Sequence, residues 1–225
     1  MQSTREVDLN DVKLIHPFTM IAAGPTGSGK TYLIRDLLNN HKSTIRNISK
    51  NIINVVWAYG IWQKIYESPM KNVNFKYISG VPEEEDIENA DIVIIDDLMR
   101  QIKKNGFVLD LFTQISHHNN QSVIILSQNL YTKGDIIRDL NLNSHYIVIF
   151  KSPRDQRQVM ALGNQIKPRD IQYFMSSYEQ ATEKAHGYLL IDNRQETLEE
   201  YRLRTQIILN KETDNKFRPI IFIKK

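Results

Sequence analysis

One segment of this 225-residue chain constrains its fold more than any other, the glycine-rich stretch GPTGSGKT from Gly24 to Thr31. It matches the pattern G-x-x-x-x-G-K-[S/T] at every fixed position, with an apolar run before it and a segment of helical spacing after it. Glycines allow the backbone to curl so that successive N–H groups face a phosphate, and the N-terminus of the following helix adds a positive end. The segment therefore predicts a site for the phosphates of a nucleoside triphosphate.

The residues of this loop have separate expected roles. The Lys30 ammonium is expected to reach the β- and γ-phosphates, and so to act in catalysis, while the Thr31 hydroxyl binds Mg²⁺. ATP and Mg²⁺ are the cofactors that this chemistry requires. The whole segment is expected to contact the nucleotide: Gly24, Pro25, Thr26, Gly27, Ser28, Gly29, Lys30 and Thr31.

A pair of acids follows the apolar run Ile92–Ile95. At the carboxyl end of a strand that neighbours the strand before the loop, Asp96 would hold Mg²⁺, directly or through water. Asp97 would then lie where a general base for an attacking water is needed. This second acid favours an enzyme that hydrolyses ATP over a small-molecule kinase, which does not activate water.

Polar residues also follow the next apolar run, Ser122–Leu126. Side chains at the end of such a strand can donate to a γ-phosphate or orient a water. Among them, Gln128 is the expected γ-phosphate sensor, and it is counted with the catalytic residues.

Short apolar runs alternate with segments of helical spacing along the chain. Most of the runs are continuous, as expected for strands buried on both faces of a parallel sheet, so the alternation predicts an α/β fold with a mostly parallel, doubly wound sheet flanked by helices. The helical segments are Tyr32–Asn40, Leu98–His117 and Arg154–Leu162. The runs are Phe18–Ala23, Ile52–Ala58, Phe75–Ser79, Ile92–Ile95, Ser122–Leu126, Tyr146–Phe150 and Tyr188–Ile191.

The expected organisation is one domain with two appendages. Residues 1–16 form an N-terminal arm, residues 17–192 the nucleotide-binding domain, and residues 193–225 a C-terminal extension. A late apolar run in the extension, Arg218–Ile223, is either an added edge strand or a contact with a partner.

Composition excludes several classes of protein. The chain has no cysteine, so disulfides and thiolate metal sites are excluded, which fits a reducing compartment. No stretch approaches the roughly 18 apolar residues of a membrane span, and the N-terminus has no apolar signal region. A soluble intracellular protein, not a secreted one, is expected.

Charge is unevenly distributed although the net charge is only +3. Residues 81–97 contain acids and no lysine or arginine, whereas basic residues outnumber acids from 98 to 171 and again from 201 onward. These basic stretches are either solvated surfaces or a side that faces a polyanion.

The order of these motifs resembles the FtsK–HerA superfamily of DNA-pumping ATPases, P-loop NTPases of the RecA-like, ASCE type. Within it, the chain is similar to the poxvirus-type packaging ATPases of large DNA viruses and of Maverick/Polinton-like elements. The resemblance runs from about Phe18 to Thr205 and includes the stretches SQNLYTKGDIIRDLNLNSHYIVIFKSPRDQRQV and HGYLLIDNRQETLEEYRLRT. Its most specific signal is a strand that ends in glutamine, followed by the FKSPRDQ block.

The resemblance implies a homo-oligomeric ring, a hexamer or a pentamer, that translocates double-stranded DNA into a preformed viral capsid. A capsid or portal-vertex protein is then an expected partner, and the virion or the infected cell's cytoplasm or nucleus the expected location. Lys133 and Arg138, in an expected glycine-containing loop after the glutamine-ended strand, are the candidates for contact with the DNA backbone. The alternative is a plain surface loop.

Two positions depart from the family pattern. Many members carry glutamate after the metal-binding acid, where this chain has the shorter Asp97. Relatives also tend to place an arginine just before the glutamine-ended strand, to reach the neighbouring subunit's site, and residues 117–121 contain none. Either another arginine takes this role, with Arg154 preferred and Arg157 and Arg138 as the other candidates, or stimulation between subunits is weak.

Other functional classes remain open from the sequence. One is a different P-loop enzyme, such as a nucleotide kinase or an AAA-like DNA-processing ATPase. A kinase would need an arginine-rich lid and an acceptor pocket, and its Asp97 would have no purpose. Another is a nucleotide-gated adaptor without enzymatic activity, which the filled catalytic positions disfavour.

Overall fold

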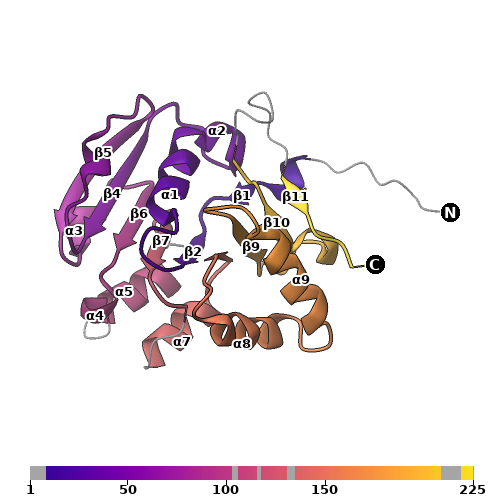
Figure 1. The fold of residues 1–225 in the computed structure, drawn as a ribbon. Helices are drawn as coiled ribbons and strands as arrows, with labels where there is room; N and C mark the ends of the chain where they lie inside the picture. Colours follow the sequence, from indigo (N-terminus) through magenta and orange to yellow (C-terminus); the bar gives the residue numbers. More distant parts are fainter. Residues whose placement is uncertain (1–8, 103–105, 116–117, 131–134, 209–218, 225) are drawn as a thin grey trace.

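The computed structural model describes residues 9–102, 106–115, 118–130, 135–208 and 219–224. Nine strands of these residues form one sheet, in the order β11-β10-β9-β8-β2-β7-β6-β4-β5 (Figure 1). The parallel strands are β2 (Thr19–Ala23), β4 (Ile53–Tyr59), β5 (Val73–Ser79), β6 (Ile92–Asp96), β7 (Ser122–Ser127) and β8 (Tyr146–Phe150). The prediction of an α/β fold with a mostly parallel sheet is confirmed.

Three further strands extend one side of the sheet. β9 (Tyr188–Asp192) pairs antiparallel with β8, β10 (Leu203–Thr205) pairs antiparallel with β9, and β11 (Ile220–Ile221) lies at the edge. Two further short strands, β1 (Leu14–Ile15) and β3 (Ile45–Arg46), pair in parallel and form a separate small sheet.

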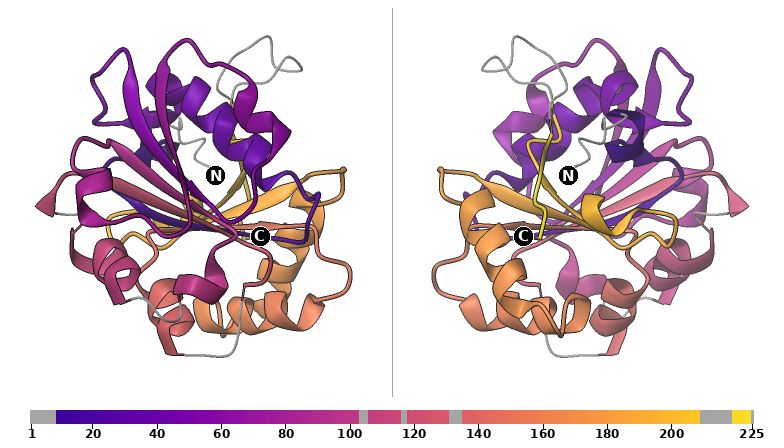
Figure 2. Two further views of the ribbon diagram at one scale, coloured as in Figure 1. Left: turned by 90° about the vertical axis from the view of Figure 1, so that its left-hand side faces the viewer. Right: turned by 90° about the vertical axis from the view of Figure 1, so that its right-hand side faces the viewer.

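Helices cover both faces of the sheet, so the molecule has three layers (Figure 2). One face carries α1 (Lys30–Asn39) and α2 (His41–Thr44). The other carries α5 (Gly106–Asp110), a π-helical turn (Leu111–Ile115), α7 (Asp135–Leu142), α8 (Gln156–Ile166) and α9 (Ile171–Ala181). Shorter elements are α3 (Glu84–Ile87), α4 (Met99–Ile102), and the 3-10 turns η1 (Leu9–Val12), η2 (Lys64–Glu67) and η4 (Glu199–Tyr201).

The continuous apolar runs are explained by this arrangement. Successive side chains of a strand point to opposite faces, and both faces are covered. In β2, Met20 and Ala22 belong to the core that includes Leu33 of α1, whereas Ile21 belongs to the core that includes Phe174 of α9. A strand in which apolar and polar residues alternate would instead place polar side chains in one of the two cores.

The strand order differs from expectation in one respect. The acid-bearing strand β6 does not neighbour the loop-bearing strand β2, because β7 lies between them and pairs with both. The expectation that these two strands are neighbours was wrong. Parallel strands are joined by crossovers, so a strand formed later in the chain, here β7, can insert between two earlier ones.

Two further predictions of local structure were wrong. Residues 98–117, expected as one helical segment, contain α4, α5 and the π-helical turn in their described parts. Arg138, expected in a loop, lies on helix α7. Within the described residues, no helix is long and apolar enough to cross a membrane.

Candidate nucleotide-binding site

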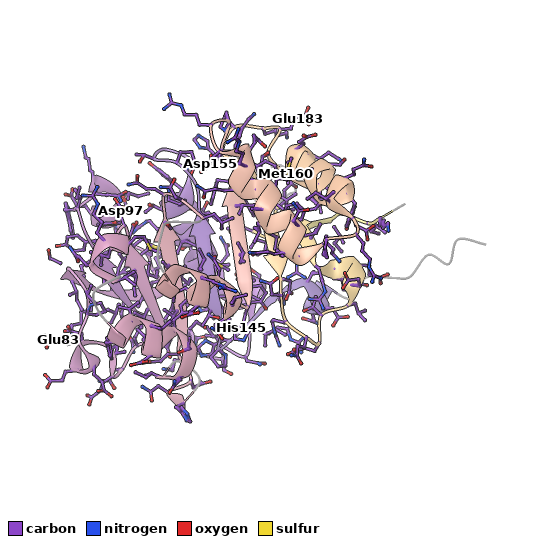
Figure 3. The ribbon with its side chains drawn as sticks, turned by 90° about the horizontal axis from the view of Figure 1, so that it is seen from below. Glu83, Asp97, His145, Asp155, Met160 and Glu183 are labelled. Carbon is purple, nitrogen blue, oxygen red and sulfur yellow. The ribbon has the colours of Figure 1, made fainter. Side chains whose placement is uncertain are left out.

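The predicted site residues gather at one edge of the sheet. The carboxyl ends of β2, β6, β7 and β8 meet there, and because β9 runs antiparallel its N-terminal end arrives at the same edge. Figure 3 shows Asp97, Asp155 and Glu183, which follow β6, follow β8 and precede β9, along one border of the molecule. His145, which precedes β8, lies toward the opposite border.

A cavity of about 840 Å³ opens at this edge. Its walls combine loop residues, the first turns of α1, the ends of β6 and β7, and the residues around the start of β9. The predicted site residues that line it are Thr26, Gly27, Gly29, Lys30, Thr31, Asp96, Asp97 and Gln128. The other lining residues are Tyr32, Leu33, Asp36, Ile61, Gln63, Leu126, Phe150, His186 and Tyr188.

Backbone geometry explains the glycines of the loop. Gly27 and Gly29 have φ angles of 78° and 103°, which lie in the left-handed region that side chains with a Cβ rarely adopt. Gly24 has no room for a side chain, because a Cβ there would lie 2.7 Å from the Cβ of Phe150. Gly24, Pro25 and Ser28 do not line the cavity, although the same loop contains them.

Lys30 begins helix α1 and folds its side chain back over the loop. Its ammonium donates to the carbonyl of Gly24 over 2.5 Å and to that of Pro25 over 3.0 Å. Burial lowers its pKa, and the nearby carboxylates of Asp96 and Asp97 act in the opposite direction. A cation held in this position would meet the phosphates of a nucleotide cradled by the loop.

Thr31 and Asp96 offer oxygen ligands in the same cavity. Asp96 is only 4% exposed, and burial raises the pKa of its carboxyl despite the opposing effects of Tyr66, Trp57 and Lys30. No group of three or more His, Cys, Asp or Glu residues in the described ranges could hold a metal ion by itself. The hydroxyl oxygen of Thr31 and the carboxylate oxygens of Asp96 are of the kind that Mg²⁺ takes as ligands, with phosphates and waters completing its shell.

Asp97 and Gln128 lie together beyond the ends of the adjacent strands β6 and β7. Both are exposed to the cavity, and the Gln128 amide bonds the Asp97 carboxylate. Asp97 has a positive φ of 57°, and its backbone N–H donates to the carbonyl of Leu126 over 3.3 Å. This turn directs the second acid of the pair away from the strand and into the opening.

The remaining predicted residues are not among those that line this cavity. Arg154 is exposed in the turn between β8 and α8, and it does not line the nucleotide cavity of its own chain. Arg138 lines a second cavity, of about 410 Å³, together with Ile147 and Asn193 at the opposite edge of the sheet. Lys133 lies outside the described residues.

Three residues at this edge were not predicted. His186, in the turn before β9, lies against Gly29 and has its Nδ1 atom 3.3 Å from the carbonyl oxygen of Ser28. Tyr188 lines the cavity, and its hydroxyl accepts a hydrogen bond from the backbone N–H of Ile207. Tyr66 donates to Asp96. The run Tyr188–Ile191 was recognised as a strand, but only its antiparallel direction would have placed His186 beside the loop.

The pKa of Tyr66 is raised far above its ordinary value, first by burial and then by the charge of Asp96 and the hydrogen bond to it. The tyrosine hydroxyl therefore keeps its proton, and remains a donor, at any pH where the protein would work.

The sequence matches no protein-family model and no curated protein. The fold is similar to solved structures of the genome packaging NTPase B204 from Sulfolobus turreted icosahedral virus 2. The complex of that protein with sulfate has a TM-score of 0.52, with 14% identity over 78% of this chain and 91% of that chain. The complex with AMP also has a TM-score of 0.52, with 15% identity over 78% and 92%.

At such low identity the likeness establishes a shared fold. The resemblance to viral packaging ATPases, inferred from the order of the motifs, is confirmed at the level of that fold.

Proposed function

We propose that this protein is an ATP hydrolase that works as a motor, translocating double-stranded DNA into a viral capsid. The observation that carries the proposal is that one cavity brings together Lys30, Thr31, Asp96, Asp97 and Gln128. These residues come from the start of α1 and the ends of β6 and β7, and they would provide a cation for the phosphates, metal ligands, a general base and a γ-phosphate sensor.

The proposed chemistry follows from the contacts of each side chain. Lys30 exchanges its bonds to the loop carbonyls for the β- and γ-phosphates. Thr31 and Asp96 hold Mg²⁺, which when bound neutralises charge on the phosphate oxygens. Asp97 accepts a proton from the attacking water, and Gln128 orients that water or the γ-phosphate.

Contact with DNA is proposed for a part of the surface away from the nucleotide. Arg138 shares its cavity with two other cations, Lys167 and Arg202, and with Glu199, which both of them pair with. A cluster with more positive than negative charge suits a phosphate backbone. Lys133 remains the second proposed DNA contact.

We also propose that the chain works as a hexameric or pentameric ring. The nucleotide cavity opens at the surface, and Arg154 is exposed at the same edge of the sheet without facing the cavity of its own chain. This position favours an arginine that completes the site of a neighbouring copy. A capsid or portal-vertex protein would be the docking partner, in the virion or the infected cell.

Residues 17–192 are the proposed ATPase domain, with residues 1–16 as an arm and 193–225 as an extension. The described part of the extension includes β10 and β11, which lie at the sheet edge farthest from β5.

The test is ATP turnover with Mg²⁺, measured with and without double-stranded DNA and without any phosphate acceptor. We expect turnover that rises with DNA, and loss of both ATP binding and turnover in Lys30→Ala. Turnover that appears only with a phosphate acceptor would indicate a kinase, and nucleotide binding without turnover would indicate an adaptor. Unchanged ATP affinity and rate in Lys30→Ala would overturn the proposal.

A further inference from the structure

We propose that Tyr66 is a positioning residue that fixes the orientation of the Asp96 carboxylate for a bound divalent cation. The inference rests on the proposed function, in which Asp96 is a ligand of Mg²⁺. It adds to that function a residue from η2, an element that contains none of the sequence motifs.

The contact between the two residues is short and buried. The Tyr66 hydroxyl donates to Oδ2 of Asp96 over 2.7 Å, and the two residues are 3% and 4% exposed. Hydrogen bonds to an ionised carboxylate are about twice as strong as those between neutral groups, and low polarity strengthens them further. This bond therefore restrains the rotation of the carboxylate.

Within the described residues, Tyr66 is the donor that bonds the Asp96 side chain. The indole N–H of Trp57 is also buried and lowers the pKa of the Asp96 carboxyl, but it has no partner within hydrogen-bond geometry. With Oδ2 engaged by Tyr66, Oδ1 is the oxygen available to a cation in the cavity. Without this donor, the buried carboxylate would be free to rotate about its bond to Cβ, and neither oxygen would be held toward the cavity.

The tyrosine is itself held in place from several sides. Its ring stacks on Tyr77 with centroids 5.4 Å apart, and it packs against Trp57 and Trp62, each at 5.3 Å. The Tyr77 hydroxyl donates to the backbone carbonyl of Tyr66 over 3.1 Å. The hydroxyl that reaches Asp96 is therefore presented by a fixed ring.

The hydrogen bonds around Tyr66 and Tyr77 also involve helix α1, which begins at the phosphate loop. Arg35, on α1, donates to the Tyr77 hydroxyl over 3.4 Å and also bonds the carbonyl of Ser68, just after η2. Because α1 also begins with Lys30 and Thr31, the phosphate loop, the proposed metal ligand and η2 form one connected unit.

Loss of the Tyr66 hydroxyl is expected to change the affinity for the metal ion and not the affinity for the metal-free nucleotide. Groups that orient the ligands of a metal commonly contribute about 10–100-fold to its affinity. Tyr66→Phe removes the hydroxyl and keeps the ring in its aromatic cluster. We expect it to weaken metal binding by about 10–100-fold and to leave metal-free nucleotide binding unchanged.

The experiment measures Mn²⁺, a paramagnetic substitute for Mg²⁺, by electron paramagnetic resonance with a non-hydrolysable ATP analogue bound. Affinity for the same analogue is measured in EDTA. The matched control is Tyr77→Phe, which loses a hydroxyl of the same cluster that does not bond Asp96. We expect the control to keep the Mn²⁺ affinity of the unaltered protein.

The outcomes separate this inference from the proposed function. If the unaltered protein binds no nucleotide, the proposed function fails. If it binds nucleotide and Mn²⁺, and Tyr66→Phe binds Mn²⁺ equally well, only the role of Tyr66 is overturned. Equal losses of Mn²⁺ affinity in Tyr66→Phe and Tyr77→Phe, or an equal loss of metal-free nucleotide affinity, would show a general packing effect and would also overturn it.

A second variant covers a failure of Tyr66→Phe to fold. Fluorotyrosine introduced at position 66 keeps both ring and hydroxyl but changes the acidity of the donor. A shift in Mn²⁺ affinity supports the positioning role, and an unchanged affinity overturns it.

Discussion

The side-chain amide of Gln128 donates to both carboxylate oxygens of Asp97, over 3.0 Å and 2.9 Å. The two residues lie just beyond the ends of adjacent strands, so the proposed base and the proposed sensor are in direct contact. A water that Asp97 activates would bind one of the remaining lone pairs of this carboxylate, beside the Gln128 amide. In the proposed function both side chains would act on the same water, so we expect them to behave as a unit.

The first prediction separates the two acids. Asp97→Asn should bind ATP but hydrolyse it about 10²–10⁴-fold more slowly, because the general base is lost. Asp96→Asn should instead lose the Mg²⁺ dependence of ATP binding. Phosphate release and nucleotide titrations with and without Mg²⁺ distinguish them. Wild-type turnover in Asp97→Asn would mean that another group is the base.

A second prediction concerns coupling between Asp97 and Gln128. If they act on one water, the combined variant Asp97→Asn/Gln128→Ala should lose little more rate than the worse of the two single variants. The measurement is the rate of ATP hydrolysis in all four combinations. Losses that multiply would show that the two side chains act independently.

Gly24→Ala tests the packing beneath the phosphate loop. The new methyl group would lie 2.7 Å from the Cβ of Phe150 and 2.9 Å from Oγ of Ser28, so the loop must shift. We expect at least about tenfold weaker ATP binding and a loss of about 1–3 kcal/mol in unfolding free energy. Calorimetric ATP titration and urea unfolding measure the two effects.

Gly106→Ala is the matched control for this variant. Gly106 begins α5, and nothing lies within 4 Å of a Cβ added there. It should leave ATP affinity unchanged and stability unchanged or slightly raised, by up to about 1 kcal/mol. Equal ATP affinity in Gly24→Ala and the control would contradict the packing argument.

A mixing experiment tests whether Arg154 acts on a neighbouring copy. Arg154→Ala and Lys30→Ala chains are each expected to be inactive. In a mixed ring, the intact Arg154 of one chain can complete a site that contains the intact Lys30 of the other, so activity should partly return. An arginine supplied in this way is typically worth about 10³–10⁵-fold in rate. Mixed assemblies that regain nothing would exclude Arg154, and a protein that stays monomeric with ATP and DNA would exclude the ring.

His16 predicts how stability depends on pH. Its ring is buried, its Nδ1 atom lies 2.7 Å from Oγ of Ser122, and burial lowers its pKa from 6.5 although Asp91 acts in the opposite direction. The unfolded chain then binds more protons than the folded one as the pH falls through 6.5, so stability is lost below that pH. The slope from this residue is at most about 1.4 kcal/mol per pH unit.

Urea unfolding between pH 5 and 8 measures this slope. His16→Asn removes the titrating group, and it should flatten the slope between pH 5 and 6.5 whatever it does to stability at pH 8. A slope that persists in the variant would assign the effect to another group.

The strands and the loop were predictable because their signals are local. Met20, Ile21 and Ala22 belong to cores on opposite faces of the sheet, and only a continuous apolar run satisfies both. The start of α1 at Lys30 likewise follows from the glycines that precede it. The roles of the site residues stay predictions until they are tested.

The strand order and the supporting residues were not predictable in this way. β7 lies between β2 and β6 because of how the crossovers pack, and the local sequence of a strand does not indicate its position in the sheet. Tyr66 and His186 come from segments without helical or strand periodicity. Each reaches the site through contacts that are distant in sequence, with Asp96 in one case and with Ser28 in the other.

The contact between His186 and the phosphate loop has a consequence for how this chain is made. Its two partners are 158 positions apart, and the strand that carries the loop pairs with β7 and β8, which are themselves synthesised much later. A ribosome therefore releases the loop long before the neighbours that shape it. The loop can make its contact with His186 only after this residue, which precedes β9, has emerged from the ribosome.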